Sequence, residues 1–269
     1  MNLYVNGKRR TTDCCSLHSL KEEICSEASS IVMIYNGFQT ESDVDLCEDD
    51  NVSFIEKGVM PSEDELEALM VARHTPYVHE KVKKARVAIA GLGGLGSNIA
   101  VALARTGVGH LHLVDFDIVE PSNLNRQAYK IGHLGMKKTK ALKSELKDIN
   151  PYIKVSTDDI KVTEENAVSL FENDPIVCEA FDRPEYKAML VNTLLEQQPR
   201  IKLVAASGLA GYESSNFITT KKVFKNLYIC GDSESSAQPG RGLMAPRVSI
   251  CAGHQANMIL RLILGIEDV

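Results

Sequence analysis

Residues 86–96 read RVAIAGLGGLG, and this stretch decides the fold of most of the chain. Its first five residues form a short run rich in apolar side chains, which predicts a buried β-strand. Glycines follow at 91, 93, 94 and 96, and helical spacing resumes over 98–106. Glycine permits a tight turn in which backbone N–H groups approach a phosphate at the positive end of the helix. The stretch predicts a strand, a nucleotide-binding loop and a helix, although a tight turn without a ligand has the same pattern.

Strands and helices alternate through the rest of the chain. This rhythm predicts an α/β domain over residues 85–269, with a Rossmann-like, mainly parallel sheet and helices on both faces. The pattern predicts a closing helix over 248–264, broken near Gly253, and an antiparallel extension of two strands near 216–219 and 223–228. The remaining elements are expected as strands at 110–114, 153–156, 176–180 and 202–206, and as helices at 137–148, 164–171 and 184–197.

Residues 1–60 predict a separate, small α+β domain. Apolar and polar residues alternate ahead of Asn6-Gly7, a dipeptide typical of hairpin turns. A helix-like stretch near 17–24 and strands at 31–35 and 52–55 complete the order ββαββ. This order is the pattern of a β-grasp, the fold of ubiquitin, and an unrelated small α+β cap is the alternative.

Residues 61–84 predict a helical connector between the two domains. Ser62 followed by Glu65 forms a capping-box pattern, and an apolar stripe comes after it. Thr75-Pro76 then predicts the start of a second helix, with threonine as N-cap and proline at the first helical position.

Composition and charge narrow the class of protein. With 269 residues and 44% hydrophobic content, the chain can bury one large core and a smaller one. A net charge of −6 does not favour nucleic acid or an anionic membrane as the main partner. No run of 18 apolar residues is present, and the start MNLYVNGKRR lacks the order of a signal peptide. We therefore expect a cytoplasmic protein without a membrane span.

The cysteine pattern argues against metal and disulfide scaffolds. The seven cysteines stand at 14, 15, 25, 47, 178, 230 and 251, and no two of them form a Cys-x-x-Cys pair. Tetrahedral zinc sites usually use such pairs, and disulfides are rare in reducing compartments. We expect no structural zinc and no disulfide framework.

Polar and charged residues follow the second predicted strand. Asp115 ends that strand, where a carboxylate can hydrogen-bond ribose hydroxyls, and a nicotinamide dehydrogenase would share this feature and the glycine loop. Hydride transfer has no use for the arginine and lysines that come next, at Arg126 and 137–140. Such cations stabilise the charge that moves toward pyrophosphate when ATP is attacked at its α-phosphorus. Each cation alone could be a solvated surface base; together they favour ATP.

The string GLGGLG…DFDIVEPSNLNRQ…GMKKTKA resembles the activating enzymes for ubiquitin-like proteins, which include the bacterial adenylyltransferases for molybdopterin and thiamine sulfur carriers. The resemblance covers about residues 70–265, and residues 72–98 with the N-terminal domain are most similar to the thiamine branch. It implies an enzyme that uses ATP and Mg2+. It implies nucleotide contacts from Gly91, Gly93, Gly94, Gly96, Asp115 (to the ribose), Asp117, and Asn123, Arg126 and Lys138 (to the phosphates).

The resemblance also places an essential metal-binding aspartate at Asp182, where the alternative is a helix N-cap ahead of Pro184. Arg183 stands where the family usually has asparagine. Arg73 is similar to an arginine that dimeric relatives contribute to the partner subunit's phosphates, although an ordinary exposed helix arginine fits as well. Catalysis is thus expected from Arg126, Lys138, Asp182 and Arg73.

The implied function is ATP-dependent adenylylation of the C-terminal carboxylate of a small ubiquitin-like sulfur carrier ending in Gly-Gly, in thiamine (thiazole) biosynthesis, by a homodimer. The alternatives are activation of a molybdopterin carrier or of a tRNA carbonyl, or a non-catalytic scaffold that holds ATP and docks a carrier. The N-terminal domain has no free Gly-Gly end, because its last strand runs into residues 56–60. We expect it to be a non-catalytic carrier-like module.

Overall fold

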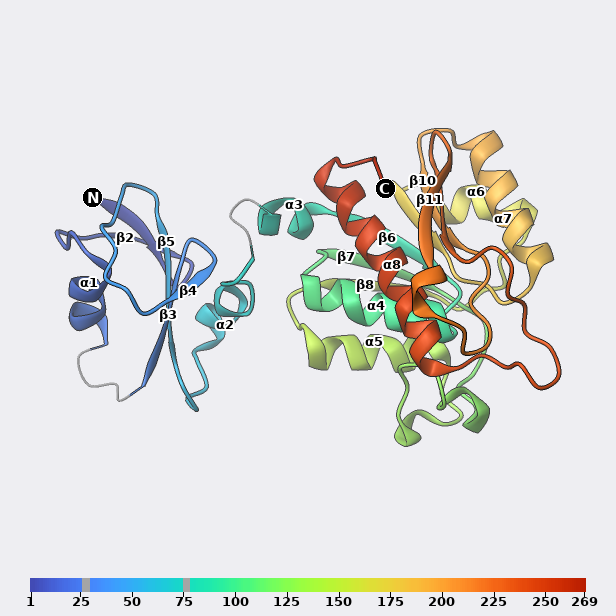
Figure 1. The fold of residues 1–269 in the computed structure, drawn as a ribbon, viewed down its shortest axis with the longest axis horizontal. Helices are drawn as coiled ribbons and strands as arrows, with labels where there is room; N and C mark the ends of the chain where they lie inside the picture. Colours follow the sequence, from blue (N-terminus) through green and yellow to red (C-terminus); the bar gives the residue numbers. More distant parts are fainter. Residues whose placement is uncertain (26–29, 75–77) are drawn as a thin grey trace. The chain divides into compact units, whose positions relative to one another are not determined.

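The computed structural model describes residues 1–25, 30–74 and 78–269, without the side chain of Asp64. The chain divides into two compact units, Met1–Glu80 and Lys81–Val269, which Figure 1 colours from blue to red along the sequence. The predicted helix start at Thr75-Pro76 lies outside the described residues. Within those residues, every helix is too short or too polar to cross a bilayer.

The first unit is built on a five-stranded sheet. Strand β1 is parallel to β5, and all other neighbours are antiparallel. The hairpin turn forms as predicted, with positive φ at Asn6 and Gly7. Helix α1 packs Leu17 and Leu20 into the core of the sheet. The strands, in the order β2-β1-β5-β3-β4, are β1 (Asn2–Val5), β2 (Lys8–Thr11), β3 (Ile31–Tyr35), β4 (Phe38–Thr40) and β5 (Asn51–Glu56), with α1 at Leu17–Ile24.

This arrangement confirms the predicted β-grasp. Helix α2 (Glu63–Met70) follows the sheet and lies against the hairpin turn, because a Cβ added at Gly7 would fall 2.4 Å from the Cβ of Ala68. The predicted capping box is wrong: the hydroxyl of Ser62 donates to the Glu65 carboxylate at 2.8 Å and caps no backbone N–H. The short helix α3 (Val78–Lys84) leads into the second unit.

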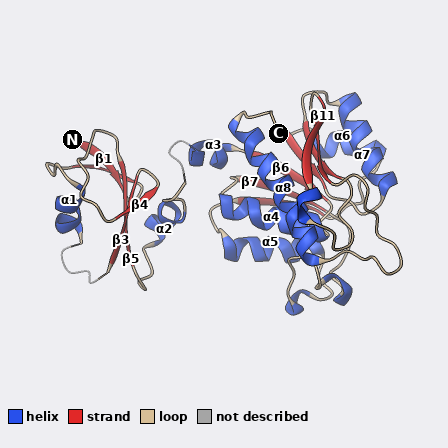
Figure 2. Cartoon of the chain, in the orientation of Figure 1, coloured by secondary structure: helices blue, strands red, loops and turns tan. Residues whose placement is uncertain are grey.

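The second unit is a seven-stranded sheet in the order β11-β12-β10-β9-β6-β7-β8. All its strands are parallel except the edge strand β11. Helices α4, α5 and α8 pack together on one face, and α6 and α7 on the other (Figures 1 and 2). The strands are β6 (Arg86–Ala90), β7 (His110–Val114), β8 (Lys154–Asp158), β9 (Ile176–Glu179), β10 (Lys202–Ala206), β11 (Thr219–Phe224) and β12 (Leu227–Gly231). The helices are α4 (Gly94–Thr106), α5 (Lys138–Ile149), α6 (Glu164–Phe171), α7 (Pro184–Gln197) and α8 (Ala245–Leu264).

The predicted α/β class is confirmed, and three details differ. Helix α4 begins at Gly94, four residues before the predicted start, so Gly94 and Gly96 belong to its first turn. Strands β11 and β12 begin three or four residues later than predicted, and β12 runs parallel to β10, so only β11 is antiparallel. Helix α8 is continuous through Gly253. Glycine at this exposed position costs the helix only about 1 kcal/mol, which the packing of the rest of α8 outweighs.

Candidate active site

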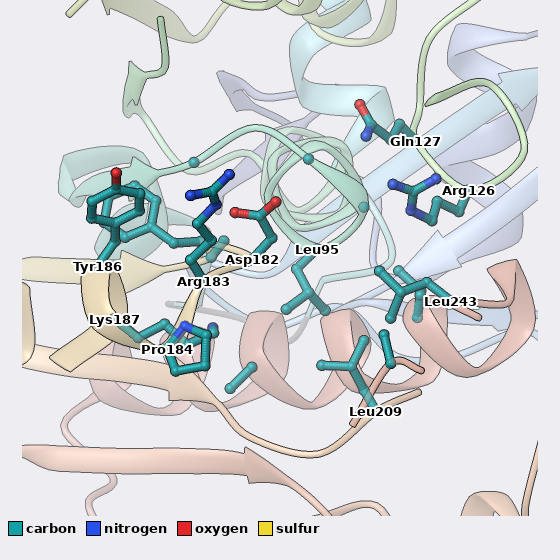
Figure 3. A pocket seen from close by; sticks show the side chains of 18 of the residues that line it. Leu95, Arg126, Gln127, Asp182, Arg183, Pro184, Tyr186, Lys187, Leu209 and Leu243 are labelled. Atoms are coloured by element: carbon teal, nitrogen blue, oxygen red, sulfur yellow. The ribbon is translucent and has the colours of Figure 1, made fainter. Parts of the chain in front are cut away.

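A cleft of about 1060 Å3 opens in the second unit at the carboxyl ends of β6, β7, β9 and β10. Loops that follow these four strands line it, together with residues 233–237. Figure 3 shows Asp182 and Arg183 on one side of the cleft and Arg126 and Gln127 on the opposite side. Open α/β sheets bind their ligands at this edge.

The glycine loop forms the floor of the cleft. Gly91 has φ +91°, and its N–H donates to the Val114 carbonyl at 2.9 Å. Gly93 is the N-cap of α4, and Gly91, Gly93 and Gly94 all line the cleft. Gly96 does not line it: a Cβ there would lie 1.8 Å from the Gly91 carbonyl oxygen. Gly96 therefore lets α4 approach the loop, while Gly93 and Gly94 bring the backbone N–H groups at the start of α4 to the cleft.

Asp115 holds the glycine loop in place. Its carboxylate is buried and accepts hydrogen bonds from the N–H groups of Leu92 at 2.7 Å and Asp117 at 2.8 Å. The carboxylate also lines the cleft. Each oxygen retains a free lone pair, so the group can tether the loop and still accept a hydroxyl proton.

Lys138 and Asn123 lie at the edge of the cleft. The ammonium group of Lys138, buried at the start of α5, pairs with the half-exposed Asp117 carboxylate at 2.9 Å. The Asn123 amide oxygen accepts from the Glu120 N–H at 3.0 Å, which fixes the turn between them. All three predicted residues, Asp117, Asn123 and Lys138, line the cleft.

Arg126 packs against the glycine loop. A Cβ on Gly94 would lie 3.5 Å from the Arg126 Cγ. Its Nη1 donates to the Ser122 carbonyl at 3.0 Å, whereas its buried Nε has no hydrogen-bond partner among the described residues. The neighbouring Gln127, which the sequence argument did not select, is also buried in the cleft, and its Oε1 is likewise unpartnered there. Unpartnered buried polar atoms of this kind are suited to a polar ligand.

Asp182 presents a free carboxylate to the cleft. It is exposed, and among the described residues it makes no hydrogen bond or ion pair. The N-cap of α7 is Arg183, so the alternative interpretation of Asp182 as that cap is wrong. No group of three acidic, histidine or cysteine side chains in the described chain could hold a metal by itself. A single carboxylate beside a phosphate site nevertheless fits Mg2+, which is commonly bound through one or two carboxylates plus substrate phosphates.

Sequence analysis did not predict a buried ion pair that lies beside residues 180–183, the loop that carries Asp182. The Glu179 carboxylate is fully buried, and the Lys187 ammonium donates to both its oxygens, at 3.0 and 2.9 Å. Burial raises the pKa of Glu179, against the attraction of Lys187. Lys187 also lines the cleft.

Two other residues were of interest from the sequence. Arg73 belongs to the first unit, where its exposed guanidinium donates to the Gln39 side chain, and its catalytic role stays a prediction. Cys230 lies in β12, and burial raises the pKa of its thiol to about 11. A buried thiol of high pKa is a poor nucleophile.

Comparisons with known proteins place the chain among relatives of similar fold. The ThiF family model matches residues 67–269, and a model described as ThiS-like ubiquitin matches residues 1–58. Adenylyltransferase and sulfurtransferase UBA4 of Candida glabrata is 32% identical over 196 residues, which cover 70% of this chain and 44% of that protein. Molybdopterin-synthase adenylyltransferase of Haemophilus influenzae is 38% identical over 132 residues, which cover 49% and 53%. The chain thus spans about half the length of these relatives.

A solved structure supports the fold. The tRNA N6-threonylcarbamoyladenosine dehydratase of E. coli, crystallised with ATP, superposes with a TM-score of 0.68 at 22% identity, covering 77% of this chain and 98% of that one. At this identity the likeness is one of fold.

Proposed function

The chain belongs to the ThiF family, and we propose that it is an ATP-dependent adenylyltransferase that activates the C-terminal carboxylate of a small ubiquitin-like sulfur-carrier protein. One observation carries the proposal: the glycine loop, Arg126, Lys138 and Asp182 line a single cleft. The unpartnered Arg126 Nε and the free Asp182 carboxylate are groups that a triphosphate and its Mg2+ would engage.

The proposed chemistry is a displacement at phosphorus. A carboxylate oxygen of the carrier attacks the α-phosphorus of ATP, the bond from that phosphorus to the bridging oxygen breaks, and pyrophosphate leaves with the electron pair. The product is an acyl-adenylate. The attacking carboxylate is ionised near neutral pH, so no protein base is needed. Arg126 and Lys138 are held in place before the reaction and stabilise the charge that develops on pyrophosphate. Mg2+, bound by Asp182 and phosphate oxygens, would neutralise part of the same charge.

For the substrate we propose a sulfur carrier of thiazole synthesis in the thiamine pathway. The support is the combination of a ThiF-family domain with a ThiS-like unit in one chain. A molybdopterin carrier is the second candidate, favoured by the 38% identity to the Haemophilus influenzae adenylyltransferase. A tRNA carbonyl is the third candidate, supported by the similarity in fold to the E. coli dehydratase.

We further propose that the enzyme acts as a homodimer and that the first unit is a non-catalytic, carrier-like module. In this unit β5 ends at Glu56 and the chain continues through residues 57–62 into α2, so the strand presents no terminal carboxylate. Deleting residues 1–60 should therefore impair assembly or carrier binding and leave ATP binding intact. Unchanged assembly and carrier affinity in the truncated chain would refute this role.

Carrier-dependent ATP–pyrophosphate exchange tests the proposed activity. We expect exchange with a Gly-Gly carrier and none with the same carrier lacking its last glycine, and a faster rate with a thiazole carrier than with a molybdopterin carrier. Lys138→Ala and Asp182→Ala should slow exchange at least about tenfold, the loss of about 1.4 kcal/mol of stabilisation. Exchange at the wild-type rate in both variants would remove the site assignment. ATP binding without exchange would identify a scaffold instead of an enzyme.

A further inference from the structure

The Glu179–Lys187 ion pair occupies an unusual place for two charges. Glu179 is the last residue of β9, and its side chain is 0% exposed, while the Lys187 side chain is 22% exposed in the first two turns of α7. A lysine near a helix N-terminus opposes the helix dipole, so its position is not explained by α7 itself. A buried ion pair is also weak evidence of stabilisation, because desolvation offsets the attraction. The pair calls for a functional explanation.

The pair encloses the loop that displays Asp182. Residues 180–183 run from Glu179 to α7, and the bonds from Lys187 to the Glu179 carboxylate join the two elements that this loop connects. The same carboxylate accepts the Phe181 N–H at 2.6 Å, and the Ala180 N–H donates to the Ala90 carbonyl at 2.8 Å. These two hydrogen bonds fix the backbone of residues 180 and 181, one to Glu179 and the other to the end of β6.

The loop also touches the glycine loop directly. A Cβ on Gly91 would lie 2.9 Å from both the Ala180 carbonyl oxygen and the Phe181 ring. Residues 180 and 181 are thus held between Gly91 and the ion pair. Any shift of this segment would move Asp182 relative to the glycine loop.

Lys187 lines the cleft, but its ammonium group is committed to Glu179. If it moved to a ligand phosphate, it would leave a carboxylate buried and unpaired, which is strongly unfavourable. This cost makes Lys187 a positioning residue and not a phosphate ligand, in contrast to Arg126, whose Nε is unpartnered.

We propose that the Glu179–Lys187 ion pair is a positioning device that fixes the 180–183 loop, and with it the Asp182 carboxylate, where it can bind the divalent cation of a nucleotide. The inference rests on the proposed function, in which Asp182 holds Mg2+. Removing either charge releases the loop and weakens the contribution of the cation to nucleotide binding, whereas the nucleotide contacts on the opposite side of the cleft remain.

The test is calorimetric titration of ATP into the full chain, with Mg2+ and with EDTA, for the wild type, Asp182→Asn, Glu179→Gln and Lys187→Met. The measured quantity is the ratio of the two affinities, which needs no turnover. We expect Mg2+ to tighten binding in the wild type, and the gain to vanish in Asp182→Asn. Outer partners of metal ligands typically change metal affinity tenfold or more, so the gain should fall by about tenfold in Glu179→Gln and Lys187→Met. The affinity in EDTA should stay unchanged.

Two further variants separate positioning from general damage. Lys187→Arg, which keeps the charge and the reach, should restore most of the Mg2+ gain. Lys202→Met removes a lysine from a surface pair with Glu267, bonded at 2.7 Å, and should leave both affinities unchanged. Should a single variant fail to fold, the double variant Glu179→Gln/Lys187→Met removes both charges together and carries the same expectation.

The outcomes distinguish the inference from the proposed function. If the wild type does not bind ATP, the proposed function falls first. If Mg2+ tightens binding in the wild type and not in Asp182→Asn, but the full gain persists in folded Glu179→Gln and Lys187→Met, the ion pair does not position Asp182 and the inference alone is overturned.

Discussion

Replacing Asp115 tests how the nucleotide loop is held. Its buried carboxylate accepts two backbone N–H groups, those of Leu92 and Asp117. Asp115→Ala removes both bonds, and water from the cleft can replace only part of their stabilisation because Leu92 is buried. A hydrogen bond to a charged group contributes about 1.5–3 kcal/mol, so we expect the free energy of unfolding to fall by about 2–3 kcal/mol.

The assay is urea unfolding followed by circular dichroism, with ATP affinity measured on the same samples. Asp115→Asn keeps one acceptor oxygen but turns its amide N–H toward the other donor, so we expect an intermediate loss of stability. Asp148→Asn, an exposed change on α5, is the matched control and should stay within about 0.5 kcal/mol of the wild type. If Asp115→Ala unfolds like the control and binds ATP as tightly as the wild type, the tether described here is refuted.

Two other predictions follow from local geometry. Gly96→Ala puts a Cβ 1.8 Å from the Gly91 carbonyl oxygen and should destabilise the protein and weaken ATP binding. Gly253→Ala, at an open site inside α8, should raise stability by about 0.5–1 kcal/mol. Equal urea midpoints for the two variants would contradict both expectations. The ring nitrogens of His112 lie 2.7 Å from Asp174 and 2.8 Å from Asp158. Burial lowers the pKa of His112, but these two carboxylates outweigh burial and raise the pKa above 6.5. The stabilisation of the fold by protonated His112 is complete below pH 6.5 and is lost as pH rises through the raised pKa, so in urea unfolding across that range His112→Asn should show a smaller fall of stability with pH.

Local patterns predicted the parts of the fold that depend on apolar periodicity. The strand Arg86–Ala90 and the helix Pro184–Gln197 appear where the sequence places them, whereas the helix after the glycine loop begins at Gly94 and not at residue 98. The strand Thr219–Phe224 was displaced in the prediction because it is a largely exposed edge strand whose residues Thr-Thr-Lys-Lys carry no apolar alternation. The predicted break of the last helix at Gly253 is wrong, because an exposed helix position tolerates glycine at a cost of only about 1 kcal/mol.

The candidate site divides in the same way. The family resemblance identified Arg126 and Lys138 in one interrupted string and Asp182 after a later strand, and all three line the cleft. The sequence did not predict the Glu179–Lys187 pair because its members lie in a strand and in the helix that follows it. Neither the two-residue period of a strand nor the 3.6-residue period of a helix relates positions in two different elements. Its only sequence signal was an acidic residue in an otherwise apolar strand.

The most direct test of the central claim is the intact mass of a Gly-Gly carrier after incubation with this protein, ATP and Mg2+. We predict that the carrier gains the mass of one AMP moiety while pyrophosphate is released, and that Arg126→Ala slows this gain about 10- to 100-fold through loss of a charge-assisted contact. A carrier of unchanged mass with the wild-type protein, or equal rates in the two proteins, would contradict it.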